Sequence, residues 1–155
     1  GKRKKPIWAI GELDYEEGDW MGDTQTVLLL NQVTKKDVLD ALQSGQMYAV
    51  TSNPKPVLEE FRIWDSINNK WVEMGGTAKV SEVTRLRIKI SIPSGHGDNI
   101  LKIIREGEVI KEFNLKSGIF DETIEVANNK SKGMTYYRID VGSRLISNPI
   151  FIVLT

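Results

Sequence analysis

MTYYRIDV, residues 134–141, follows a turn-forming segment that contains glycine, residues 128–133. Tyr137, Ile139 and Val141 take every second position, with Arg138 and Asp140 between them. A period of two is typical of a β-strand with one face in a hydrophobic core and the other in water. The stretch therefore predicts a strand of the core, and we expect the rest of the chain to pack around it.

Two adjacent tyrosines open this stretch directly after the turn. In immunoglobulin-like sandwiches, a tyrosine near the start of a late strand hydrogen-bonds back to the backbone a few residues upstream. One interpretation is such a tyrosine corner, with a hydroxyl group that ties down the turn at residues 128–133. The other is an ordinary strand with two aromatic residues, and the sequence leaves both open.

Further strand patterns follow at short spacing. The clearest is Val83–Ile92, where every second residue from Leu86 is apolar and the intervening side chains include Arg85, Arg87 and Lys89. Residues 105–108 predict a hairpin turn, with Gly107 at a position suited to positive φ. Apolar runs at 6–10 and 27–30 predict two more strands, the second buried on both faces. We expect a mostly β fold, an antiparallel two-sheet immunoglobulin-like β-sandwich of about seven strands.

One short helix is expected near the N-terminus. Thr34 is a suitable N-cap, Asp37 supports it from the first turn, and Gly45 provides the C-terminal stop. Val38, Leu39, Ala41 and Leu42 form an apolar stripe at helical spacing. Proline and asparagine at residues 52–56 mark an internal boundary. This boundary divides the chain into two parts. Residues 1–53 are expected to form a strand, an acidic loop, a strand, a helix and a strand. Residues 54–155 are expected to form a β-sandwich domain.

Composition excludes several classes of function. The 155 residues carry 21 basic and 21 acidic side chains, so no overall charge favours nucleic acid or an anionic membrane as a partner. No apolar run is long enough to span a bilayer, and the sequence shows no signal peptide. Without cysteine there is neither a disulfide nor a thiolate metal site, and one histidine, His96, cannot form a histidine cluster. Compartment and oligomeric state stay open.

Three features are weak candidates for ligand binding. The acidic run from Glu12 to Asp23 could bind a hard cation through carboxylates, or it is simply a solvated loop. Trp64 and Trp71 flank a turn at Asn68 and Asn69 and could stack on sugar rings, or they pack against the protein. The basic strand face, Arg85, Arg87 and Lys89, could contact phosphate, or it keeps an exposed sheet face soluble.

Catalytic motifs are missing from the sequence. It contains no phosphate-binding loop, no dinucleotide-binding glycine motif, and no HExxH, CxxC or GxSxG motif. We therefore expect that this chain alone is not an enzyme and holds no cofactor of its own. One function open to a chain without catalytic motifs is that of a module that binds carbohydrate or a protein partner.

Two blocks of the sequence resemble a known family. The first is GDTQTVLL at 22–29 with VLDALQSGQMYAV at 38–50, and the second is YYRIDV at 136–141 with SNPIFI at 147–152. Together they resemble the C-terminal part of PHP-domain (polymerase and histidinol phosphatase) metal-dependent phosphoesterases. In that family, the end of a metal-binding barrel leads through a helix-strand unit into a β-sandwich tail. The resemblance covers most of the chain from Trp8 onward.

The resemblance implies a non-catalytic accessory domain. Family members bind divalent metals through histidine-rich motifs early in the barrel and an Asp-x-His element near its end. At the matching place this chain has Gly-Glu-Leu-Asp-Tyr-Glu, residues 11–16, without histidine. Only Glu12 and Asp14 could be remnant ligands, too few to hold metals and activate water. The implied partner is the N-terminal barrel of a parent protein, with any metals bound in that parent.

Overall fold

The structure is a computed structural model that describes residues 6–12, 22–51, 54–94, 99–128 and 133–155. Several features singled out in the sequence lie outside these residues. They are Asp14 with most of the acidic run, His96, and most of the turn before residue 134. The structure therefore does not test the predictions for these positions.

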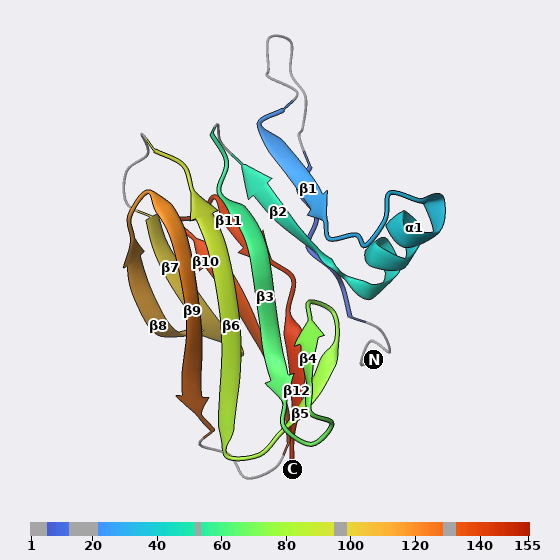
Figure 1. The fold of residues 1–155 in the computed structure, drawn as a ribbon, viewed down its shortest axis with the longest axis vertical. Helices are drawn as coiled ribbons and strands as arrows, with labels where there is room; N and C mark the ends of the chain where they lie inside the picture. Colours follow the sequence, from blue (N-terminus) through green and yellow to red (C-terminus); the bar gives the residue numbers. More distant parts are fainter. Residues whose placement is uncertain (1–5, 13–21, 52–53, 95–98, 129–132) are drawn as a thin grey trace.

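The described residues form a mostly β fold with one short helix, as expected (Figure 1). They contain twelve strands, so the expectation of about seven was wrong. The strands are β1 (Thr24–Leu28), β2 (Met47–Thr51), β3 (Val57–Asp65), β4 (Lys70–Glu73), β5 (Thr77–Val80), β6 (Val83–Ile92), β7 (Asn99–Arg105), β8 (Glu108–Leu115), β9 (Gly118–Ala127), β10 (Gly133–Val141), β11 (Leu145–Ser147) and β12 (Ile150–Leu154). The helix is α1 (Lys35–Ser44).

The strands make two sheets. The eight-stranded sheet, called sheet A below, has the order β1-β2-β11-β10-β12-β5, and β7 and β8 extend it from β10. The four-stranded sheet, sheet B, has the order β4-β3-β6-β9. All the described pairs are antiparallel except β5 with β12, which are parallel. The expectation of a purely antiparallel arrangement was therefore wrong at this edge of sheet A.

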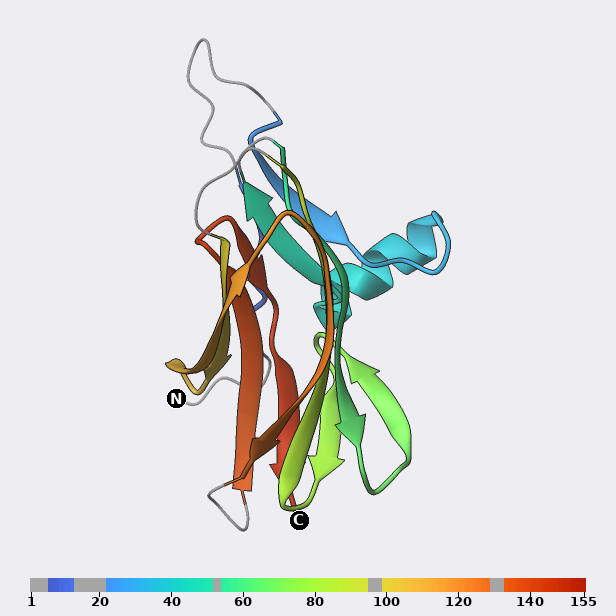
Figure 2. The same cartoon turned by 60° about the vertical axis from the view of Figure 1, so that its left-hand side comes forward.

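The opening stretch of the sequence becomes β10, which lies inside sheet A. Its second half pairs with β7, while β12 pairs with its first half and β11 with its end. Tyr137, Ile139 and Val141 are each 0% exposed, as their alternation predicted. They belong to one hydrophobic cluster with Leu86 and Ile88 of β6, so the facing surfaces of the two sheets share a single core (Figure 2).

A tyrosine hydroxyl does tie two strands together, but it belongs to Tyr48. The backbone N–H of Leu58 in β3 donates to the Tyr48 hydroxyl at 3.3 Å. Burial raises the pKa of Tyr48 above its ordinary value, and the hydrogen bond from Leu58 offsets part of that rise. In contrast, the Tyr137 hydroxyl is buried and has no hydrogen-bond partner within the described part of the chain. The tyrosine corner therefore stays a hypothesis.

Helix α1 begins and ends where its capping residues predicted. The Thr34 hydroxyl accepts a hydrogen bond from the Asp37 backbone N–H, and Gly45 adopts the left-handed conformation with φ of 81°. The Gly45 N–H then donates to the carbonyl of Ala41 at 2.9 Å. At ten residues, α1 is too short to cross a bilayer, and the described residues hold no helix that could.

Two predicted strands differ from the structure. Residues 6–10 were expected to form a strand, but no strand is assigned there. Side chains hold this segment instead, because Asn148 bonds both the N–H and the carbonyl of Ala9 and the Thr26 hydroxyl bonds Gly11. The run at 27–30 was expected to be buried on both faces. It is half-buried, because β1 is the terminal strand of sheet A.

Sheet A joins the two segments that the sequence divides at residue 53. β2 lies before the boundary and pairs with β11, which lies after it. Asn148, which is 1% exposed, also donates to the carbonyl of Met47 at 3.1 Å. The division into two domains stays a prediction, and the two segments are connected by both sheet pairing and a buried side chain.

Candidate functional site

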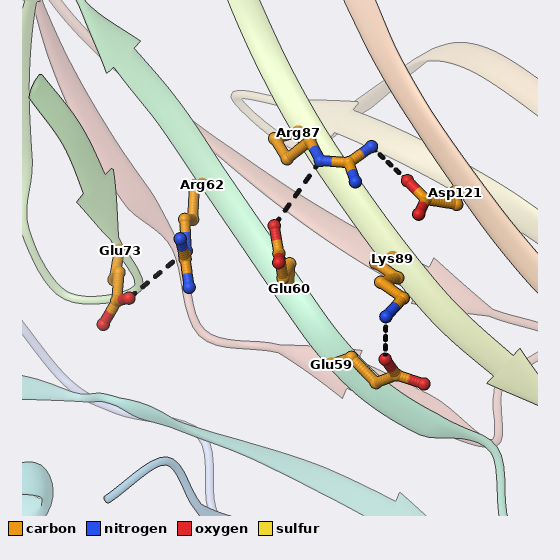
Figure 3. A network of polar contacts seen from close by, with 7 residues as sticks. All are labelled: Glu59, Glu60, Arg62, Glu73, Arg87, Lys89 and Asp121. Carbon is orange, nitrogen blue, oxygen red and sulfur yellow. Dashed lines mark ion pairs between the residues drawn. The ribbon is translucent and has the colours of Figure 1, made fainter. Parts of the chain in front are cut away.

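Ion pairs cover the outer face of sheet B (Figure 3). Arg87 of β6 lies between Glu60 of β3, at 3.5 Å, and Asp121 of β9, with which it also pairs. Lys89 pairs with Glu59 at 2.6 Å. Two further pairs, Arg62 with Glu73 and Arg85 with Glu125, lie on the same face. Each pair joins neighbouring strands, because side chains on one face of a sheet meet across the register.

These pairs neutralise the basic strand face. A hydrogen bond from Lys89 lowers the pKa of Glu59, while the bond to Glu59 raises the pKa of Lys89. Likewise, the bond to Asp121 raises the pKa of Arg87. Exposed pairs contribute little to stability, because water screens their charges. However, they leave Arg85, Arg87 and Lys89 engaged with carboxylates, which favours the solvated-face interpretation over phosphate binding.

Trp64 and Trp71 lie directly opposite each other on β3 and β4, on this same face. Their ring centroids are 5.3 Å apart and the rings meet edge to face at 66°. Trp71 is 37% exposed, so the pair is not buried in the core. The edge-to-face contact orients the Trp71 ring before any ligand arrives.

The turn that follows Trp64 is fixed by Asp65, which is 1% exposed. Its carboxylate accepts hydrogen bonds from the N–H groups of Ile67 and Asn68 and from the Asn68 side chain. Burial pushes the pKa of Asp65 upward, but these bonds outweigh it, so the pKa lies below its ordinary value. The ionised carboxylate therefore holds the turn at Asn68 and Asn69 that the sequence predicted.

A pocket of about 420 Å³ opens beside Trp71. Arg62, Lys70 and Glu73 line it from sheet B, and it is also lined by Ser44, the last residue of α1, and by Gln46, which follows the helix. Trp71 lines this pocket, and Trp64 does not. A ring face beside paired charges and a glutamine amide offers both stacking and hydrogen bonding to a polar ligand.

The predicted metal ligands do not form a site in the described residues. Glu12 is exposed, and Asp14 lies outside the described residues. Nowhere in ranges 6–12, 22–51, 54–94, 99–128 and 133–155 do three or more histidine, cysteine, aspartate or glutamate side chains gather around a common point. Glu12 thus stays a candidate on sequence alone.

Helix α1 leaves half of its apolar stripe uncovered. Ala41 is buried and Val38 is half-buried, whereas Leu39 and Leu42 are 49% and 41% exposed. Successive residues turn by about 100°, which places Leu42 and Leu39 roughly 40° and 100° round the helix from Val38. Figures 1 and 2 both show α1 projecting from the side of the two sheets. Val33, at the approach to the helix, is 94% exposed.

The uncovered helix face and the Trp71 pocket both offer contacts to a ligand or a partner. Arg62 and Glu73 pair with each other beside the pocket, and Lys70 also lines it. Searches against protein-family models, curated proteins and solved structures found no significant match to the chain.

Proposed function

We propose that this chain is a non-catalytic accessory domain of a PHP-type metal-dependent hydrolase. Its two sheets would form an immunoglobulin-like β-sandwich that supports the barrel or helps to position substrate. The two sequence blocks that resemble the family support this proposal, and so does the single core shared by both sheets. Divalent metals would be held by the barrel of the parent protein.

The observation that carries the proposal is the uncovered apolar face of α1. The helix is capped at both ends, so its position does not depend on fraying residues. Gly75 approaches it so closely that an added Cβ would lie 1.5 Å from the Ser44 carbonyl oxygen, which fixes the end of the helix on the sheets. An ordered helix that exposes Leu39 and Leu42 is suited to packing against another folded domain. In the family resembled, that domain is the barrel.

The non-catalytic part of the proposal is tested by assaying the purified chain for phosphoesterase activity with Mn²⁺ or Zn²⁺. We expect no hydrolysis of p-nitrophenyl phosphate above the metal-only blank, under conditions in which an intact PHP-type hydrolase is active. Metal-dependent turnover that falls in Glu12→Gln would contradict the proposal. That variant separates activity of this chain from a contaminant, because Glu12 is exposed and its replacement leaves the core unchanged.

The second candidate is a carbohydrate- or protein-binding module, favoured by the exposed Trp71 ring beside the pocket. Sugar rings stack on flat aromatic faces, and Gln46 and Arg62 would supply hydrogen bonds around the ring. A glycan array with the native chain and Trp71→Ala is the test. Binding lost in Trp71→Ala would favour carbohydrate binding, whereas no glycan retained by the native chain would remove the carbohydrate-binding form of this candidate.

A further inference from the structure

The outer face of sheet A carries a second cavity, of about 460 Å³, on a different sheet from Trp64 and Trp71. Its floor consists of Tyr136 and Arg138 of β10 and Phe151 of β12. The N-terminal segment, with Pro6, Ile7 and Ala9, forms one wall, and residues 147–149 form another. These residues are far apart in sequence, and the folding of the N-terminal segment over the sheet brings them together.

Hydrogen bonds hold the walls of this cavity. Asn148 accepts from the Ala9 N–H at 2.7 Å and donates to the Ala9 carbonyl at 3.2 Å, which fastens the N-terminal segment to the sheet. The Ser147 hydroxyl accepts from the Ile139 N–H at 2.9 Å, next to Arg138. Ser147 and Asn148 are both 1% exposed. The cavity is therefore a built feature of the fold, with its shape set before a ligand binds.

Aromatic rings give the cavity an apolar side. Phe151 lies between two other rings, with its centroid 6.3 Å from Tyr136 and 6.2 Å from Trp8. Ile7, Ala9 and Pro149 add aliphatic surface. Such a lining favours a flat apolar group over a sugar, whose hydroxyl groups would need more hydrogen-bond partners than it offers.

Arg138 gives the cavity one positive charge. Its side chain is half-buried, and it forms neither an ion pair nor a hydrogen bond with any other residue in the described part of the chain. On sheet B, Arg62, Arg85 and Arg87 are all paired with carboxylates. The nearest acid along β10, Asp140, faces Lys102 of β7 across the register and accepts from the Ser143 N–H.

We propose that this cavity binds a small carboxylate that carries an aromatic ring. The planar guanidinium of Arg138 matches a carboxylate in a two-point hydrogen-bonded pair, and Tyr136 and Phe151 would pack on the ring. The inference stands apart from the proposed accessory role, because it uses neither α1 nor a barrel.

The test compares benzoate with benzamide, its neutral counterpart, by amide and arginine side-chain NMR titration of the native chain. We expect saturable benzoate shifts centred on Ala9, Arg138 and Phe151, and benzamide binding about tenfold weaker. Acetate, which lacks the ring, is expected to bind more weakly than benzoate. Equal affinity for benzoate and benzamide, no saturable shift, or a response to glucuronate without one to benzoate would overturn the proposal.

Substitutions test whether Arg138 supplies the positive charge that binds the carboxylate of the ligand. In Arg138→Gln the preference for benzoate over benzamide should disappear, whereas Arg62→Gln, on sheet B, should keep it. Phe151→Leu should weaken both ligands without changing their ratio, since it alters only ring packing. A preference that persists in Arg138→Gln would overturn the assignment. The ligand comparison in the native chain remains decisive if a variant loses its dispersed spectrum.

Discussion

Tyr137→Ala is expected to destabilise the chain by about 3–5 kcal/mol, the usual cost of deleting a large buried aromatic side chain. Tyr137 is the largest fully buried side chain in the described residues, and it lies on β10, between β7 and β12. Its removal leaves a cavity between the two sheets that the strands can close only by shifting. Urea unfolding followed by fluorescence measures the loss as a change in the free energy of unfolding.

Tyr137→Phe separates packing from hydrogen bonding at the same site. Because the buried hydroxyl has no partner among the described residues, its removal should be neutral or stabilise the fold, by up to about 1–3 kcal/mol. A tyrosine corner predicts the opposite, a loss of about 1 kcal/mol in Tyr137→Phe.

The result that would contradict the expectation for Tyr137→Ala is a loss below about 1 kcal/mol. It would mean that the Tyr137 ring does not lie in the core.

Gly75→Ala is the second substitution with a large expected effect, a loss of roughly 2–5 kcal/mol. Gly75 has φ of +80°, which strains any residue with a Cβ. In addition, the new Cβ would lie 1.5 Å from the Ser44 carbonyl oxygen, a backbone atom that cannot rotate away. The turn after β4 and the end of α1 would have to separate. Thermal unfolding and the helix signal in circular dichroism would both report this.

Gly107→Ala is the matched control for this clash. Gly107 also has positive φ, +90°, but an added Cβ there meets nothing within 4 Å. It should cost only the conformational strain, about 1–2 kcal/mol. Equal losses in the two variants would show that the helix end does not press on Gly75, and would remove the argument that α1 is held rigidly.

Local sequence patterns predicted two kinds of helix, strand and turn. In one kind the contacting residues are close in sequence, and in the other one face is apolar and the opposite face is polar. The alternation at Val83–Ile92 matches β6 at both ends, and Thr34 and Gly45 bracket α1. The turn at Glu106 and Gly107 has positive φ at both residues, as a type I′ hairpin turn requires. In each case the chemistry of neighbouring residues decides the backbone.

Local sequence patterns could not predict pairing between residues that are far apart in the sequence. Residues 6–10 look like a strand, but Asn148 holds Ala9 across a separation of 139 residues. β5 was missed although Ala78 and Val80 alternate with polar residues, because its parallel partner β12 lies more than sixty residues away. A four-residue run carries too little signal to predict a strand without knowledge of its neighbour.

Local sequence patterns were also insufficient to predict the candidate binding sites, whose residues come from distant parts of the chain. The sequence singled out Trp64 and Trp71 from the turn between them, and in the structure they lie opposite each other on β3 and β4. The alternation predicted that Arg138 faces outward, and Tyr136 is two positions before it on the same strand. Nothing local showed that Phe151 and the N-terminal segment would lie beside them, since that contact depends on the Ser147 and Asn148 junction. The uncovered half of α1 was equally invisible, because its stripe looked like any core-facing helix.

The measurement that tests the accessory role most directly is sedimentation velocity of this chain mixed with the barrel that the proposal predicts. The proposal predicts that the gene encodes a PHP-type barrel with His-x-His motifs, and that this barrel, expressed separately, forms a one-to-one complex with the chain. Leu39→Lys with Leu42→Lys should abolish the complex. Ile119→Lys with Met134→Lys should preserve it, since these residues are 67% and 64% exposed on β9 and β10. A gene without a barrel, or a complex unchanged by the Leu39 and Leu42 substitutions, would contradict the account.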